Sequence, residues 1–119
     1  MCDNKNCKKV LFKSESPFPL FTAIMIGQIA YMDDYKILLV HDDLYCGFNE
    51  MIVELGLFEE VIRIDESDRS ISKIEKSVND ILEKHSDIDD YFMCVFSDCY
   101  SLAFAYALKG KANLHIFPE

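Results

Sequence analysis

Residues 8–31 read KKVLFKSESPFPLFTAIMIGQIAY, and this stretch decides the fold. It opens with a short apolar run at 10–12, which has the size of a buried strand. Serine and proline gather in residues 14–19, where they break that strand. An apolar run over 20–31 follows and is long enough for about three helical turns. The stretch therefore predicts a strand, a tight turn and a helix.

The start of this helix depends on its prolines. Ser16 before Pro17 predicts an N-cap residue followed by proline at the first helical position, where a missing N–H costs nothing. Pro19 is the alternative, with the helix starting two residues later. Apolar residues occupy nearly every side of the helix, so we expect the rest of the protein to cover it on most sides.

Strands and helices alternate along the rest of the chain. We predict strands at 8–13, 35–40, 60–64, 91–96 and 113–117, and helices at 17–31, 48–55, 70–85 and from a cap at Ser97 or Asp98 to Lys109. Gly56 and Gly110 are the expected ends of two helices. This order predicts an α/β fold, a three-layer Rossmann-like domain whose five parallel strands lie in the order 3-2-1-4-5. The first helix and the 70–85 helix should lie on opposite faces of the sheet or be well separated.

Composition bounds the class of protein. The 119 residues suffice for a single domain over 8–119, with residues 1–7 as a flexible tail. A net charge of −9 argues against nucleic acid or an anionic membrane as the main partner. No apolar stretch reaches the roughly 18 residues of a membrane span, and the polar amino terminus is not a signal peptide. The five cysteines are odd in number and lack CxxC spacing, so we expect reduced thiols and a cytoplasmic protein.

Ligands of an open parallel sheet bind beyond the carboxyl ends of its strands. The candidate site residues are those that follow each predicted strand: Ser14, Glu15, Ser16 and Pro17; His41, Asp42 and Asp43; Asp65; Ser97, Asp98 and Cys99; and Glu119. The alternative for each of them is a solvated turn residue or a helix cap. The set is acidic and contains no arginine.

Three of the reactive side chains have a plainer interpretation. His41 followed by Asp42 offers half of a metal site or an acid–base pair, which is a weak signal, and we expect no metal. Cys99 is the one candidate for a reactive thiol at a helix start, but a structural cysteine is favoured. His115 lies inside the fifth strand and is expected to be a core or edge histidine.

The four glycines argue against a nucleotide cofactor. None lies in the turn after the first strand, where a dinucleotide fingerprint or a P-loop needs the backbone to approach phosphate. Response-regulator receivers and flavodoxins fit poorly too, because their acidic or glycine-rich loops are missing at this turn. We therefore expect no cofactor.

The opening stretch resembles the start of bacterial sialyltransferases of the lipooligosaccharide and capsular polysialyltransferase type. Those proteins begin with an apolar strand, a Thr/Ser-Pro-apolar-Gln-Leu turn into an apolar helix, and an acidic, apolar second strand. Residues 16–20, SPFPL, match that turn, with Pro19 in place of the usual glutamine. The resemblance implies a Rossmann-like amino-terminal half of a two-domain GT-B glycosyltransferase that acts in bacterial surface polysaccharide synthesis.

The same resemblance implies roles for the end of the chain. In that family the fifth strand runs into an acidic-acidic-glycine motif, one carboxylate of which is thought to be the general base. Glu119 matches one acidic position and Pro118 replaces the other. By the resemblance, Glu119 deprotonates the hydroxyl of a glycan acceptor, and residues 14–17 line the cleft. The nucleotide-sugar donor would bind a carboxy-terminal domain, so this half should be inactive alone.

A different class of function also fits these residues. The chain could be a complete small α/β module that binds or regulates a protein partner without catalysis. Its apolar last strand, at 113–117, has no following helix to cover it. We therefore expect self-association through that strand, most simply as a two-fold dimer.

Overall fold

A computed structural model of the chain describes residues 7–14, 17–41, 48–65, 67–94 and 99–117. Its elements are β1 (Lys9–Ser14), α1 (Pro17–Ala30), β2 (Tyr35–His41), α2 (Phe48–Leu55), β3 (Glu60–Ile64), α3 (Ile71–Lys84), β4 (Asp90–Cys94), α4 (Cys99–Leu108) and β5 (Asn113–Phe117). All neighbouring strands pair in parallel, in the order β3-β2-β1-β4-β5. The predicted Rossmann-like fold and its strand order are confirmed.

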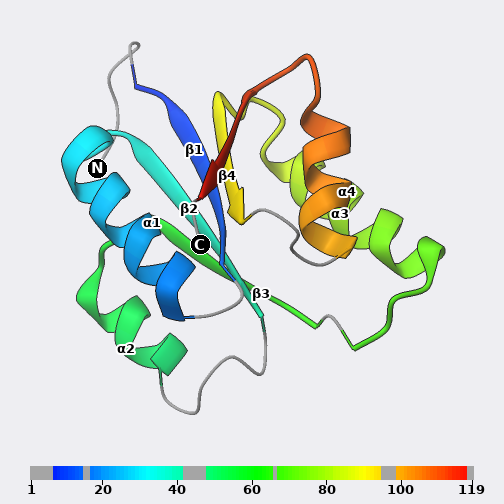
Figure 1. The fold of residues 1–119 in the computed structure, drawn as a ribbon, viewed down its shortest axis with the longest axis horizontal. Coiled ribbons are helices and arrows are strands. Elements are labelled where there is room, and N and C mark those ends of the chain that lie inside the picture. The colour runs from blue at the N-terminus through cyan, green and yellow to red at the C-terminus, as the bar shows by residue number, and fades with distance from the viewer. Residues whose placement is uncertain (1–6, 15–16, 42–47, 66, 95–98, 118–119) are drawn as a thin grey trace.

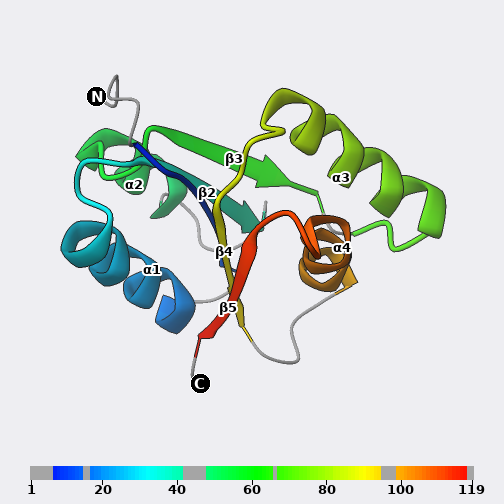
Figure 2. The same ribbon diagram turned by 90° about the horizontal axis from the view of Figure 1, so that it is seen from above.

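The helices α1 and α2 lie on one face of this sheet, and α3 and α4 lie on the other (Figures 1 and 2). Because side chains alternate along a strand, β1 divides its apolar residues between both faces. Val10 and Phe12 pack in the cluster beneath α1 and α2, while Leu11 joins the cluster beneath α3 and α4. As predicted, α1 and α3 lie on opposite faces.

The expectation that α1 would be covered on most sides is wrong. One side of the helix is buried, with Leu20 and Ala23 fully inside the core. The opposite side is exposed, with Met25 at 61% and Ile29 at 79% of its full accessible surface. The sheet offers a single face to each helix, so the apolar composition of α1 exceeds what this fold can bury. The outer side is an apolar, uncharged surface.

The ends of the other helices follow the local signals in the sequence. The side chain of Ser70 caps α3 by accepting a hydrogen bond from the backbone N–H of Lys73. Gly56 and Gly110 follow α2 and α4 with φ angles of 64° and 79°, a left-handed conformation that favours glycine. Ile71, the first residue of α3, is exposed.

The cysteines depart from the sequence-based expectation at one position. Cys7 is disulfide-bonded, so the prediction of reduced thiols is wrong there. The absence of CxxC spacing excludes one kind of pair and does not test for cysteines brought together in other ways. Cys99 is a free, exposed thiol at the start of α4. In the part of the chain that the structure describes, no helix has the length and apolarity needed to cross a membrane.

Candidate functional site

The candidate site lies at the carboxyl end of β1, in the middle of the sheet. From β1 the chain proceeds through α1 to β2 on one side, whereas β4 leads through α4 to β5 on the other. The strand order therefore reverses between β1 and β4, which is where open α/β sheets bind their ligands. Ser14 is the last residue of β1 and pairs with Val40 of β2.

The structure describes only part of the predicted site. Pro17 is the first residue of α1 and His41 the last residue of β2, although their side chains are outside the described set. Asp65 follows β3, and Cys99 begins α4. The predicted site residues Glu15, Ser16, Asp42, Asp43, Ser97, Asp98 and Glu119 lie outside the described residues.

Ser14 carries the clearest site signal. Its side chain has no exposed surface, and its Oγ has no hydrogen-bond partner among the described residues. Most buried hydroxyls are paired, because an unpaired one costs about 1–3 kcal/mol of folding free energy. Ser14 shares the face of β1 that α1 covers, since it follows Phe12 by two residues. An unpaired hydroxyl is therefore held at the strand end that precedes α1.

The first turn of α1 is poorly suited to phosphate. Helix N-termini hold anions through free backbone N–H groups. Two of the first three residues of α1 are proline, Pro17 and Pro19, which have no N–H to donate. The remaining donors with Ser14 fit a neutral hydroxyl group better than a phosphate.

Lys13 is the site residue that sequence reasoning missed. Its side chain is fully buried, and it points to the face of β1 shared with Leu11, where α3 and α4 pack. A buried ammonium requires acceptors or a counter-charge, because its desolvation is costly. The signal in the sequence was a lysine at an inward position of the otherwise apolar strand KVLFKS. The carboxyl end of β1 thus contains a buried cation, and the site is less uniformly acidic than its sequence suggested.

Asp65 and Cys99 favour the plainer interpretations. Oδ1 of Asp65 accepts hydrogen bonds from the backbone N–H of Ser67, at 3.0 Å, and from its hydroxyl, at 2.7 Å. This is the local hydrogen bonding of a turn. Cys99 is a free, exposed thiol at the start of α4.

A second polar cluster lies at the opposite, amino end of the sheet. Oδ1 of the buried Asp90 accepts hydrogen bonds from Nε2 of His115, at 3.0 Å, and from Nδ2 of Asn113, at 3.2 Å. Nζ of Lys8 lies 3.9 Å from Oδ2 of Asp90. Burial raises the pKa of the Tyr31 hydroxyl, and the nearby Asp90 carboxylate raises it further. These contacts fasten β5 to β4, and they confirm that His115 is an edge histidine.

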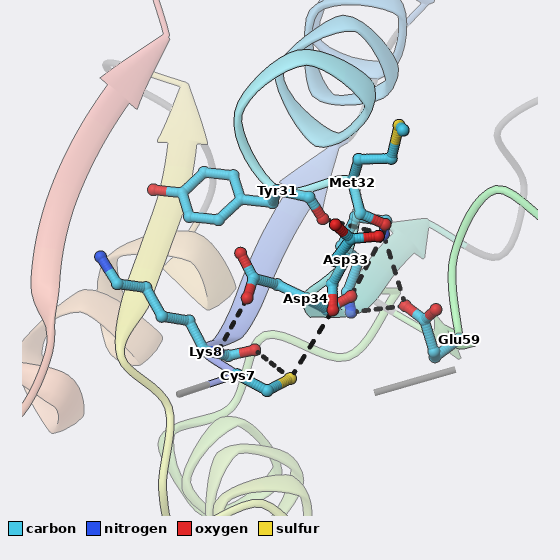
Figure 3. A network of polar contacts seen from close by, with 8 residues as sticks. Cys7, Lys8, Tyr31, Met32, Asp33, Asp34 and Glu59 are labelled. Atoms are coloured by element: carbon cyan, nitrogen blue, oxygen red, sulfur yellow. Dashed lines mark hydrogen bonds and ion pairs between the residues drawn. The ribbon is translucent and has the colours of Figure 1, made fainter. Parts of the chain in front are cut away.

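Lys36 also lies at the amino end of the sheet, and its side chain is almost fully buried under α1. Its ammonium donates hydrogen bonds to the carbonyl oxygens of Tyr31, Met32 and Asp34 at 3.0, 3.1 and 3.2 Å. Oε1 of Glu59 lies 3.7 Å away. Figure 3 shows these carbonyl groups and Glu59 gathered beyond the end of α1. A cation here also compensates the negative end of the helix dipole.

A pocket of about 390 Å³ opens near the same amino end, lined by Lys8, Asp89, Gly110, Lys111, Ala112 and Asn113. It lies away from the carboxyl ends of the strands, where parallel sheets bind ligands. Its two lysines and one aspartate are surface side chains, so the lining selects no ligand by charge. We regard the carboxyl end of β1 as the better site.

Comparison of this chain with protein-family models, with curated proteins and with solved structures gave no match. The resemblance to bacterial sialyltransferases therefore stays a prediction, supported by the residues quoted for it.

Proposed function

We propose that this chain is the acceptor-binding, amino-terminal half of a GT-B glycosyltransferase of the bacterial sialyltransferase type, inactive alone. The observation that carries the proposal is the carboxyl end of β1. There, between β1 and β4, the strand order of the Rossmann-like sheet reverses. A buried, unpaired hydroxyl and a buried ammonium lie at this point, beside a helix start that disfavours phosphate. Such a site suits a hydroxyl-rich ligand and leaves nucleotide binding to another domain.

The roles of individual residues follow from this proposal. Ser14, with Glu15, Ser16 and Pro17, would contact the acceptor sugar, and so would His41, Asp42, Ser97 and Asp98. Glu119 would take the proton from the attacking acceptor hydroxyl as it displaces the nucleotide from the donor sugar. The donor would be bound by a carboxy-terminal domain. Surface polysaccharide synthesis in the cytoplasm is the setting that we propose.

Acceptor binding is the direct test with the chain as it is. We expect a galactose-terminated oligosaccharide to shift the backbone NMR signals of residues 12–14 and 17–20 at millimolar concentrations. Ser14→Ala should weaken this binding about five- to tenfold, since one hydrogen bond contributes about 1 kcal/mol or slightly more. Ser67→Ala, in an exposed turn after β3, is the matched control and should not change it. Absence of shifts with oligosaccharides ending in galactose, glucose or sialic acid would refute acceptor binding.

Transfer itself needs the second half. We expect no sugar transfer from a CMP-sugar by this chain alone, and transfer to a galactose-terminated acceptor by a protein that continues it. A reading frame that continues with glycine and a second α/β half supports the proposal, whereas a stop codon after Glu119 supports a separate module.

A protein-binding or regulatory module without catalysis is the second candidate function. The exposed, uncharged outer side of α1 favours it, because apolar surfaces of this kind mark interaction sites more often than sugar sites. The NMR titration discriminates the two, since a module of this kind has no reason to bind oligosaccharides at the end of β1.

A further inference from the structure

We propose that β5 is a dimerisation edge, at which two copies of this chain pair their β5 strands antiparallel across a two-fold axis. The two five-stranded sheets would then form one continuous sheet. This inference does not depend on the glycosyltransferase proposal, since it concerns the edge of the sheet and not the carboxyl end of β1.

The outer edge of β5 is open in the described part of the chain. β5 pairs with β4 and, among the described strands, with no other (Figure 2). Every second backbone N–H and C=O of such a strand points outward and can pair with another strand. Residues 113–117, NLHIF, contain no charged residue and no proline, so the usual protection of an edge strand is missing.

The opposite edge of the sheet shows the contrast. β3 carries Glu60 and Arg63, and both are engaged in ion pairs at this edge. Lys84 Nζ lies 3.0 Å from Glu60 Oε2, and Arg63 Nη2 lies 2.8 Å from Glu50 Oε1. Charged side chains of this kind discourage pairing with another strand. The two edges are therefore unequal, and β5 is the one available for pairing.

The side chains of β5 also lack cover. Leu114 and Ile116 are the register partners of Tyr91 and Met93, so they point to the face covered by α3 and α4. Even so, 44% of Leu114 and 59% of Ile116 remain exposed. A second β5 alongside would bring apolar side chains against both.

The symmetry of antiparallel pairing favours a second copy as the occupant, because the same apolar residues then meet on both sides of the two-fold axis. The chain has a net charge of −9, so two copies repel each other over most of their surface. The strand β5 carries no charge, so two copies can approach there without like charges meeting. Antiparallel pairing with full overlap sets Leu114 of one copy opposite Ile116 of the second copy, and His115 opposite itself. A five-residue edge buries a small area, so we expect micromolar association and not a permanent dimer.

Sedimentation over a concentration series tests this proposal. We expect the wild type to shift from monomer to dimer across the micromolar range. Ile116→Lys should raise the dissociation constant of the dimer about tenfold or more, because it places a positive charge in the β5 strand of each copy. Ile71→Lys is the matched control, since Ile71 is an exposed isoleucine on α3, away from β5, and this variant should dimerise like the wild type.

Amide hydrogen exchange of the wild type gives a test that needs no variant. We expect the amides of 113–117 to become more protected as the protein concentration rises through the dimerisation range. A folded wild type that stays monomeric at millimolar concentration overturns the proposal. So does a dimer that Ile116→Lys leaves intact, or a dimer whose concentration-dependent protection falls on other segments than β5.

Discussion

Replacing Lys36 with methionine tests how the end of α1 is fastened to the sheet. Methionine keeps most of the length and volume of the lysine stem, which is buried under α1, but it cannot donate a hydrogen bond. The carbonyl groups of Tyr31, Met32 and Asp34 would lose a charged donor that lies 3.0 to 3.2 Å away. Removing one member of a buried charged group typically costs about 3–5 kcal/mol.

We take the lower end of that range for Lys36→Met. The three hydrogen bonds share one ammonium, so their contributions do not add, and the Tyr31 carbonyl keeps a second donor in the backbone N–H of Asp34. A loss of about 3 kcal/mol in a chain of this size lowers the melting temperature by about 12 °C. Thermal and urea unfolding followed by circular dichroism measure both quantities.

Two further variants separate the possible causes. If the ion pair with Glu59 were the main contribution, Glu59→Gln would cost as much as Lys36→Met. We expect Glu59→Gln to cost less than about 1 kcal/mol, because its carboxylate is partly exposed and lies 3.7 Å from the ammonium. Gly27→Ala adds a Cβ that would lie 3.1 Å from Cδ of Lys36. Alanine has a helix propensity about 1 kcal/mol better than glycine, but crowding against the hydrogen-bonded lysine should cancel that gain in stability.

The combination of these variants gives the refuting result. With Lys36 replaced by methionine, the side chain under Gly27 is free to move, and Gly27→Ala should then stabilise the protein. The reasoning fails if Lys36→Met costs less than about 1 kcal/mol, which is the scale of an exposed ion pair. It also fails if Gly27→Ala has the same effect on stability with and without Lys36.

Three other predictions follow from the core, the cap and the charges. Ile24→Asp should unfold the protein or lower its melting temperature by more than about 10 °C, since Ile24 packs against the core beneath α1, whereas Ile29→Asp on the exposed side should change it little. Ser70→Ala should cost about 1 kcal/mol in urea unfolding, because α3 loses its N-cap. The free energy of unfolding should fall as the pH drops below about 4.5, because two carboxyl groups have lowered pKa values in the folded protein. Burial opposes ionisation of Glu60, but Lys84 and His85 outweigh burial and lower the pKa of Glu60. A hydrogen bond from Lys9 lowers the pKa of Asp87. The folded protein binds fewer protons there than the unfolded chain, so a Glu60→Gln variant should lose less stability between pH 6 and pH 3.

The alternation of apolar runs and breakers was enough to predict the fold. Strands such as ILLV at 37–40 are apolar throughout because both of their faces are buried, and the helices between them imply parallel pairing. The ends of α2, β3 and β5 were predicted without error, since glycine and charged residues mark them locally. The exposed side of α1 could not be predicted, because a uniformly apolar helix gives no sign of which side the sheet leaves open.

The polar contacts could not be predicted for a different reason. Asp90 and His115 are separated by 25 residues in the sequence and meet only because β4 and β5 pair in one particular register. Lys36 reads as a strand residue, and nothing local shows that its ammonium reaches the end of α1. Ser14 was predicted as a site residue from its place after β1, but its burial and its unpaired Oγ depend on the packed fold.

The two ends of the sheet differ in how their polar groups are satisfied, and this difference bears on function. At the amino end, Lys36, Asp90 and Glu60 each have several described partners, so these charges hold the fold together. At the carboxyl end of β1, the hydroxyl of Ser14 is buried without a described hydrogen-bond partner. Oδ2 of Asp90 at the amino end is also buried without a described hydrogen-bond partner, but the ammonium of Lys8 lies 3.9 Å from it, whereas the described residues offer Ser14 Oγ no such partner. We propose that a ligand supplies the hydrogen-bond partner of Ser14, and for that reason we place the proposed acceptor site at the carboxyl end of β1.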